Sequence, residues 1–177
     1  MLSYSKNFQD EYLDNHLFKN YKNGFFIDFG AYDGLTFNNT LRFEKFHNWK
    51  GINFESDVKM FNALKLNRPN ATNYINFNDQ NFLHHKKKIN LLLFNFDNFG
   101  SENFFNVNFK EYFFDVVVLT STKQNNYIKP SILLTKNNFF KVRENESLFY
   151  INLNSQFNIF KKKSMVYKLQ KLNIFNN

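Results

Sequence analysis

Short apolar runs alternate along this chain with longer segments in which apolar residues recur every three or four positions. Short runs bounded by polar residues are typical of buried strands, and the longer spacing is typical of amphipathic helices. The predicted strands are 25–28, 51–54, 71–77, 89–96 and 115–119. The predicted helices are 3–22, 36–46, 58–66 and 126–138. Strands and helices that alternate in this order favour an α/β fold with a mostly parallel sheet and helices on both faces.

The pattern changes after residue 138. Residues 139–153 predict an antiparallel hairpin that turns at 144–146 and closes a domain spanning 1–154. Residues 155–177 alternate lysines with apolar residues, as in an amphipathic basic helix. We expect this tail to pack against its own domain, and an acidic partner or membrane surface is the alternative.

The stretch from Phe25 to Thr40 carries the first candidate chemistry. Its apolar run ends at Asp28, and Gly30 and Gly34 follow before a segment with helical spacing. Glycine is needed where a backbone passes close to a ligand or adopts a positive φ. The stretch therefore predicts a buried strand that turns tightly toward a bound ligand, although a plain strand and turn is the alternative.

A second acidic residue follows the next predicted strand. Glu55 comes about 25 residues after Gly30, which is roughly where nucleotide-binding α/β units place the carboxylate that binds ribose. Two acidic strand ends at this interval predict a ligand that contains adenosine.

Residues 4–56 resemble the opening of the FkbM-type S-adenosylmethionine-dependent methyltransferases. The similarity is specific over residues 4 to about 70 and looser to about 153. It is carried by a set of short matches: Gln9 and Asp10, 23–26, 28–34, Thr36, Asn39, Thr40, Phe43, Glu44 and 48–51. The resemblance implies a Rossmann-like class I methyltransferase fold with S-adenosyl-L-methionine at the carboxyl ends of the first two strands.

The resemblance also implies which residues form the site. The residues expected to bind the cofactor are Asp28, Gly30, Tyr32, Gly34, Glu55 and Asn76. Asn78 is the alternative to Asn76 beside the adenine. The acids expected to act on the acceptor, a hydroxyl of a sugar or other glycan-like small molecule, are Asp97 and Glu102, with Asp10 and Asp33 nearby if the lead-in folds over the loop.

Three departures from the family pattern weaken the prediction of a catalytic site for the methyl acceptor. Phe99 stands where the family has an acidic residue, and it can neither take a proton nor hold a metal. Residues 120–122 read Thr-Ser-Thr where the family tends to have Glu-His-Asn. The segment between the third and fourth strands is also far shorter than usual. A catalytically degenerate relative that binds without transferring a methyl group is therefore the alternative.

Composition narrows the setting. Phe and Asn supply roughly a third of the residues, which we interpret as the codon bias of an AT-rich genome, such as that of a large DNA virus or an AT-rich microbe. The chain contains no cysteine, which excludes disulfides and thiolate metal sites. We expect no metal site, signal peptide or transmembrane segment, and so a cytoplasmic protein, in the host cytoplasm if viral.

The net charge of +8 arises partly from basic clusters at 84–88 and 161–171. Such an excess attracts nucleic acid or acidic surfaces, so a small nucleic-acid-binding protein is a third hypothesis. Because the lysines do not form a recognised reader motif, we do not expect nucleic acid as the partner.

Overall fold

The structure is a computed structural model that describes residues 3–77, 87–144 and 146–158. Its strands are β1 (Phe25–Phe29), β2 (Lys50–Glu55), β3 (Thr72–Ile75), β4 (Lys88–Asn95), β5 (Phe113–Thr120), β6 (Phe139–Glu144) and β7 (Ser147–Asn152). Its helices are η1 (Lys6–Phe8), α1 (Gln9–Tyr12), η2 (Leu13–Phe18), α2 (Leu41–His47), α3 (Val58–Asn67), α4 (Ser101–Phe105), η4 (Gln124–Tyr127) and α5 (Ile128–Lys136).

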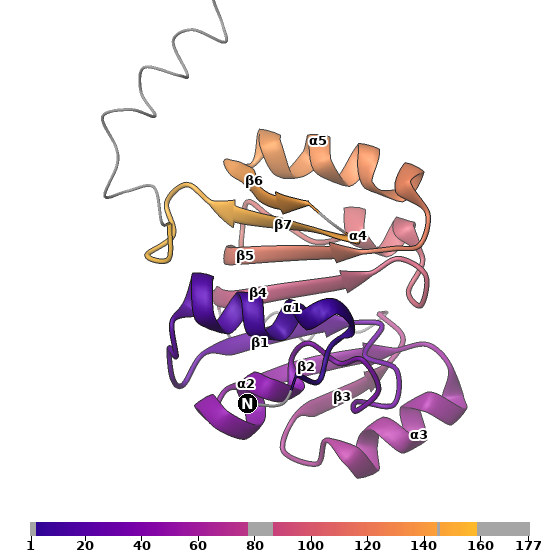
Figure 1. The fold of residues 1–177 in the computed structure, drawn as a ribbon. Coiled ribbons are helices and arrows are strands. Elements are labelled where there is room, and N and C mark those ends of the chain that lie inside the picture. The colour runs from indigo at the N-terminus through magenta and orange to yellow at the C-terminus, as the bar shows by residue number, and fades with distance from the viewer. Residues whose placement is uncertain (1–2, 78–86, 145, 159–177) are drawn as a thin grey trace, which may run out of the picture.

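The strands form one sheet in the order β3-β2-β1-β4-β5-β7-β6 (Figure 1). The five strands from β3 to β5 are parallel, whereas β7 runs antiparallel to both β5 and β6. The chain order reverses between β1 and β4, which is the point where open α/β sheets bind ligands. The predicted fold class, including the terminal hairpin, is confirmed: this is the class I methyltransferase fold.

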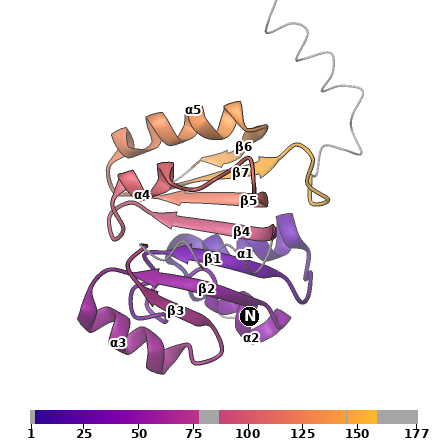
Figure 2. The same cartoon turned by 180° about the vertical axis from the view of Figure 1, so that it is seen from behind.

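Apolar residues on alternate positions of each strand build one core on each face of the sheet. One core joins Ile27, Phe29 and Phe94 to residues of α4 and α5, and the other joins Phe26 and Leu91 to residues of η2 and α2. Figure 1 shows the strands side by side from β6 to β3 with α1 in front of β1, and Figure 2 shows the sheet from behind. A sheet covered on both faces explains why the central strands are continuous apolar runs.

The lead-in is shorter and less regular than predicted. Instead of one helix over 3–22, it forms the short turns η1, α1 and η2 and ends at Lys19 with a left-handed backbone. Leu13, Leu17 and Phe18 of this segment are buried against the sheet. Packing of these side chains, rather than helix propensity, therefore holds the lead-in in place.

The predicted helix over 36–46 begins only at Leu41. Phe37 has a positive φ of 49°, which a helix does not allow, and the Asn38 side chain accepts hydrogen bonds from the Thr40 and Leu41 backbone N–H groups. Asn38 thus bonds to the orphan N–H groups at the helix start, and the residues before it form an ordered loop.

The break predicted near Lys129 and Pro130 is absent from α5. Since α5 begins at Ile128, Pro130 lies in its first turn, where a missing backbone N–H breaks no helical hydrogen bond. The predicted tail helix and most of the basic clusters lie outside the described residues. Among the helices described, none combines the length and apolarity needed to cross a membrane.

A tight contact in the sheet gives the first prediction. A Cβ on Gly51 would lie 2.4 Å from the ring of Phe26, which is fully buried and cannot move aside. We expect Gly51→Ala to lower the free energy of unfolding by about 1–3 kcal/mol, measured by urea denaturation. Lys50→Ala, at an exposed position beside it, should change that free energy by less than about 0.5 kcal/mol. Equal losses of stability in Gly51→Ala and Lys50→Ala would contradict a tight contact between Gly51 and Phe26.

Candidate functional site

A cavity of about 740 Å³ opens where β1, β4 and β5 reach their carboxyl ends. Five parts of the chain line it: the lead-in, the loop after β1, the loop after β4, the loop after β5, and the start of β7. The lining residues are Lys6, Gln9, Asp28, Gly30, Ala31, Tyr32, Thr36, Phe37, Asn38, Asn39, Leu93, Asn95, Asp97, Asn98, Thr120, Ser121, Thr122, Gln124, Tyr127, Glu146 and Ser147. Its size is that of a small-molecule site.

Asp28 lines this cavity and is almost fully buried. Its Oδ2 accepts hydrogen bonds from Thr40 Oγ1 (2.9 Å) and Asn38 Nδ2 (3.2 Å). Its Oδ1 accepts no hydrogen bond from any residue that the structure describes. Burial raises the pKa of Asp28 from 3.8 to about 6, although the Arg68 guanidinium and these hydrogen bonds oppose the rise.

Arg68 holds the loop after β1 in position. Its side chain is completely buried and forms an ion pair with Glu44 at 2.7 Å. The guanidinium also donates to Asn38 Oδ1 (3.0 Å) and to the Gly34 carbonyl (3.2 Å). A buried cation with this many partners fixes both ends of the loop relative to Asp28.

Glycine is required at both positions of the loop, Gly30 and Gly34, but a side chain would contact a different residue at each. Both have positive φ angles, +81° at Gly30 and +79° at Gly34. A Cβ on Gly30 would lie 2.9 Å from the Cβ of Asn98, and one on Gly34 would lie 2.6 Å from Cγ of Arg68. Gly30 therefore brings the turn close to the loop after β4, whereas Gly34 makes room for the buried arginine.

Glu55 is buried at the end of β2 but is not among the residues that line the cavity. Its Oε1 accepts hydrogen bonds from the backbone N–H groups of Ser56 and Asp57, and its Oε2 accepts one from that of Tyr32 (2.8 Å). Glu55 thus joins the loops after β1 and β2. A carboxylate oxygen can accept two hydrogen bonds, so Oε2 retains one acceptor position.

Several other predicted site residues also lie away from the cavity. Asn76 and Glu102 are exposed, and neither they nor Gly34 line the cavity. Asp10 is fully buried and accepts hydrogen bonds from Ser3, Tyr4 and Ser5, so it fixes the start of the lead-in. Asp33 caps the turn at Leu35 and Thr36. Asn78 lies outside the described residues.

Asp97 lines the cavity on the side away from β2. Its Oδ1 accepts a hydrogen bond from Ser121 Oγ (2.8 Å), and its Oδ2 accepts one from the Thr122 backbone N–H (2.6 Å). The Thr-Ser-Thr segment that departs from the family pattern therefore orients the carboxylate. Each oxygen keeps one acceptor position for a ligand hydroxyl.

Phe99 is buried in the core instead of facing the cavity. Only 3% of its surface is exposed, and its ring lies 5.3 Å from that of Phe29 and 6.1 Å from that of Phe94. The position that is acidic in the resembled family thus contributes to packing here.

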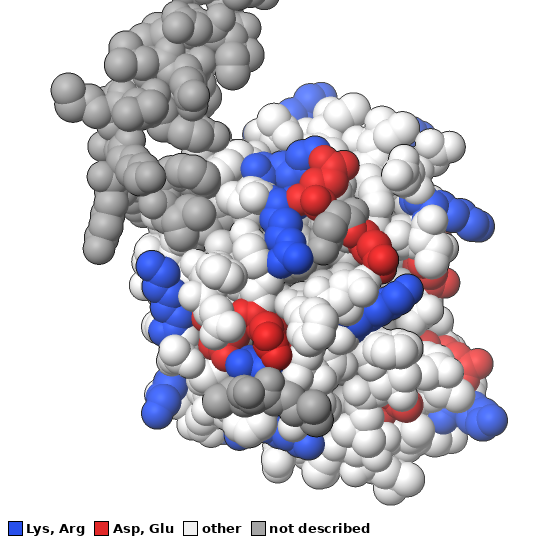
Figure 3. Space-filling view, viewed as in Figure 1, with Lys and Arg blue, Asp and Glu red and all other residues white. Residues whose placement is uncertain are grey.

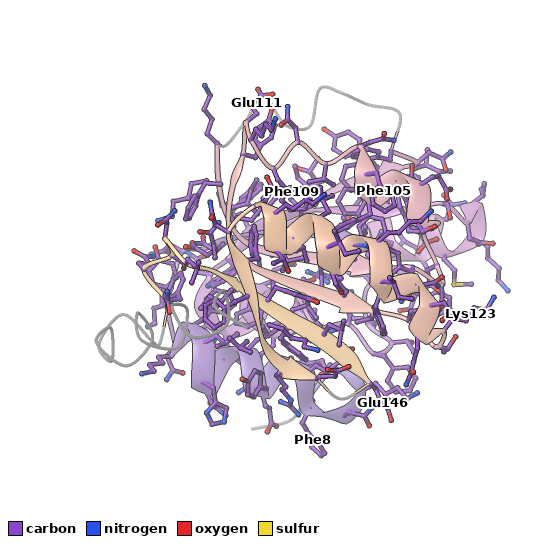
Figure 4. The ribbon with its side chains drawn as sticks, turned by 90° about the horizontal axis from the view of Figure 1, so that it is seen from above. Phe8, Phe105, Phe109, Glu111, Lys123 and Glu146 are labelled. Carbon is purple, nitrogen blue, oxygen red and sulfur yellow. The ribbon has the colours of Figure 1, made fainter. Side chains whose placement is uncertain are left out.

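The outer wall of the cavity comes from residues that the motifs did not indicate. Gln9 Nε2 donates to Ser147 Oγ at 2.7 Å, and both Lys6 and Asn7 contact the Glu146 carboxylate. Figure 4 shows Glu146 on the same rim of the molecule as Lys123, which follows β5. Of these residues, only Gln9 belongs to the matches that carry the family resemblance.

Solved structures share this fold at low sequence identity. A precorrin-6y C5,15-methyltransferase from Geobacter metallireducens has a TM-score of 0.60 and 12% identity, with 80% of this chain and 85% of that chain covered. A putative rRNA methylase from Clostridium thermocellum has a TM-score of 0.62 and 9% identity, with 88% and 99% covered. A SAM-dependent O-methyltransferase from Thermotoga maritima has a TM-score of 0.61 and 10% identity, with 88% and 69% covered.

No family model matches the chain, and no curated protein matches it in sequence. Identities this low show a common fold and do not show a common reaction. The FkbM-type assignment accordingly stays a prediction.

The raised pKa of Asp28 predicts how stability depends on pH. The folded protein holds the Asp28 proton up to about pH 6, whereas the unfolded chain releases it near 3.8. The free energy of unfolding should therefore fall by about 3 kcal/mol as pH rises across this interval, relative to Asp28→Asn. Chemical denaturation of both proteins at pH 4, 5, 6 and 7 measures the difference.

Asp33 provides a control of opposite sign. Its hydrogen bonds with Thr36 and Leu35 lower its pKa, although partial burial opposes them. Relative to Asp33→Asn, wild-type stability should therefore fall as pH drops below about 4. For Asp28, the difference in the free energy of unfolding between wild type and Asp28→Asn must change with pH. A difference that is the same at every pH would refute the burial of the Asp28 charge.

Proposed function

We propose that the protein binds S-adenosyl-L-methionine in this cavity and transfers its methyl group to a hydroxyl of a sugar or similar small molecule. The observation that carries the proposal is the position of Asp28 and Gly30 in a cavity at the β1/β4 switch point. The FkbM-type resemblance supplies the acceptor class, and the shared fold is consistent with it.

The residues present fit the methionine end of this cofactor. Asp28 Oδ1 is an acceptor without a described protein partner, and Gly30 lets the turn that lines the cavity lie close to the loop after β4. Glu55 does not line this cavity, so it would contact the ribose only where the ligand extends beyond the cavity toward the end of β2. When bound, the cofactor supplies a sulfonium methyl group that is open to displacement at carbon.

The chain itself would position the acceptor and take its proton. The side of the cavity away from β2 is rich in hydroxyl, amide and carboxylate groups, which suits a polyhydroxylated acceptor. Asp97 is the acid on that side, held by Ser121 and Thr122 with acceptor capacity to spare. It would accept the hydroxyl proton as transfer proceeds, a role typically worth 10²- to 10⁴-fold in rate.

A second candidate is a protein that binds the cofactor without transferring a methyl group. The burial of Phe99 favours it, because the site lacks the acid that the resembled family has there. Nucleic-acid binding has less support, since Figure 3 shows basic and acidic side chains interspersed on the face in view rather than gathered into one basic patch.

Cofactor binding is tested by calorimetry with S-adenosylhomocysteine. We expect wild-type protein to bind it and Asp28→Asn to bind it at least 10-fold more weakly at pH 8, because the substitution removes the negative charge from the cavity. Glu111→Gln serves as the control. Glu111 precedes β5 at the other end of the sheet, and Figure 4 shows it far from Lys123. Absence of wild-type binding would reject the proposal.

Catalysis is tested by methyl transfer to mixed mono- and oligosaccharide acceptors. We expect Asp97→Asn to lower kcat by 10²- to 10⁴-fold while the affinity for S-adenosylhomocysteine changes little, because Asp97 acts on the acceptor. Glu102→Gln, which alters the other predicted acid, should have a smaller effect. Wild-type protein that binds the cofactor but transfers no methyl group would support the second candidate instead.

A further inference from the structure

Gln9 is a buried residue of the cavity wall whose side chain is bonded at one end only. It is 5% exposed, and its Nε2 donates a hydrogen bond to Ser147 Oγ at 2.7 Å. Its Oε1 accepts no hydrogen bond from a described residue. Unlike the Oδ1 of Asn39, this oxygen is not shielded from solvent. Because Gln9 lines the cavity, a molecule in the cavity can reach the oxygen.

The bond to Ser147 fixes the direction of this oxygen. A carboxamide is planar, so a side chain whose nitrogen is held in place presents its oxygen in one direction. The bond is also sheltered, since Ser147 is almost fully buried. Gln9 Oε1 is therefore a preorganised acceptor, with two positions for hydrogen-bond donors.

The place of Gln9 in the fold assigns it to the methyl acceptor rather than to the cofactor. Ser147 begins β7, which lies three strands from β1 in the order β1-β4-β5-β7. Neighbouring strands lie about 4.8 Å apart, so about 14 Å separates Ser147 from the strand that carries Asp28. Gln9 thus borders the part of the cavity that lies beyond the methionine end of the cofactor.

The proposed base lies on the same side of the cavity. Ser147 pairs with Thr120 across the sheet. The residue after Thr120, Ser121, donates a hydrogen bond to Asp97. Gln9 and Asp97 are thus tied to β7 and β5, which adjoin, and both have acceptor positions to spare. A ligand that contacts both must supply two hydrogen-bond donors, as a molecule with several hydroxyl groups does.

We propose that Gln9 is a specificity-determining residue, whose Oε1 accepts a hydrogen bond from a hydroxyl of the acceptor other than the one that is methylated. The inference rests on the proposed function, in which Asp97 takes the proton of the methylated hydroxyl. It adds that the acceptor carries at least two hydroxyl groups, one for each residue. An acceptor that lacks the second hydroxyl leaves Gln9 Oε1 unbonded and binds more weakly.

Monodeoxy sugars test the inference. The probes are the methyl glycosides of glucose, galactose and mannose, each with its monodeoxy analogues. Dissociation constants are measured by ligand-observed NMR with protein saturated with S-adenosylhomocysteine, so that no methyl transfer is needed. We expect wild-type protein to bind one of these glycosides and to lose about 10-fold in affinity when either of two particular hydroxyls is removed. Removal of the other hydroxyls should have smaller effects.

Two substitutions separate the roles that Gln9 could have. Gln9→Met keeps the length of the side chain and removes its polar atoms. We expect it to bind the parent glycoside about 10-fold more weakly, and to bind one deoxy analogue as well as it binds the parent. Gln9→Glu offers only acceptors, so it should still distinguish that analogue from the parent. Loss of this distinction in Gln9→Glu would show that the side chain acts as a donor and would overturn the proposal.

Asn7→Gly is the matched control. Asn7 contacts the Glu146 carboxylate and so joins the same two chain segments, but it does not line the cavity. Glycine adopts the positive φ of 58° found at this position without strain. The substitution should leave the preference among the analogues unchanged. If Gln9 only fastens the lead-in, Gln9→Met will weaken all glycosides by the same factor, and its role in recognition is overturned.

The outcomes also separate this inference from the proposed function. If S-adenosylhomocysteine does not bind, both proposals fail. If it binds but no glycoside binds beside it, the sugar acceptor and the role of Gln9 fail while cofactor binding stands. If glycosides bind but Gln9→Met keeps the dependence on every hydroxyl, only the role of Gln9 is overturned. Glycosides that bind with the expected dependence but receive no methyl group would support the role of Gln9 and the second candidate function.

Discussion

The structure depends on how one buried carboxylate is held at the end of β1. Burial disfavours the charged form of Asp28 and raises its pKa. The charge of Arg68 and the hydrogen bonds from Thr40 and Asn38 offset this rise only in part. The same partners shape the loop: Asn38 caps α2, and Arg68 spans from Gly34 to Glu44. Because the carboxylate needs these partners, the loop cannot relax without exposing or isolating a charge.

This constraint explains why the cavity lies toward β4 and β5 instead of β2. On the β2 side, Glu55 is engaged by backbone N–H groups from both adjacent loops, and Ser56 Oγ donates to the carbonyl of Asn98. On the other side, the strand ends carry short polar side chains that leave space between them. The packed aromatic rings around Phe99 lie beneath the turn after β4 and support it.

The lead-in completes the site in a different way. Its apolar residues anchor it to one face of the sheet, while Gln9 bonds Ser147 at the start of β7 and Lys6 pairs with Glu146 just before it. The outer wall thus combines residues that are more than a hundred positions apart in the sequence. Asp10, which was predicted near the acceptor if the lead-in folds over the loop, instead accepts hydrogen bonds from Ser3 and Ser5 and holds the start of the lead-in.

The sequence by itself determined the class of fold and indicated the strand, β1, at whose end the cavity lies. Apolar runs followed by Asp28 and Gly30 predict a strand and a tight turn because burial and backbone sterics are local. The tertiary structure alone decided which polar atoms remain unpaired. Asn38 and Asn39 are identical neighbours in the sequence, but Arg68 and Asp28 bond the side chain of Asn38, whereas no described residue bonds the side chain of Asn39. Hydrogen bonding in a buried site depends on distant chain segments, so no local pattern could separate the two.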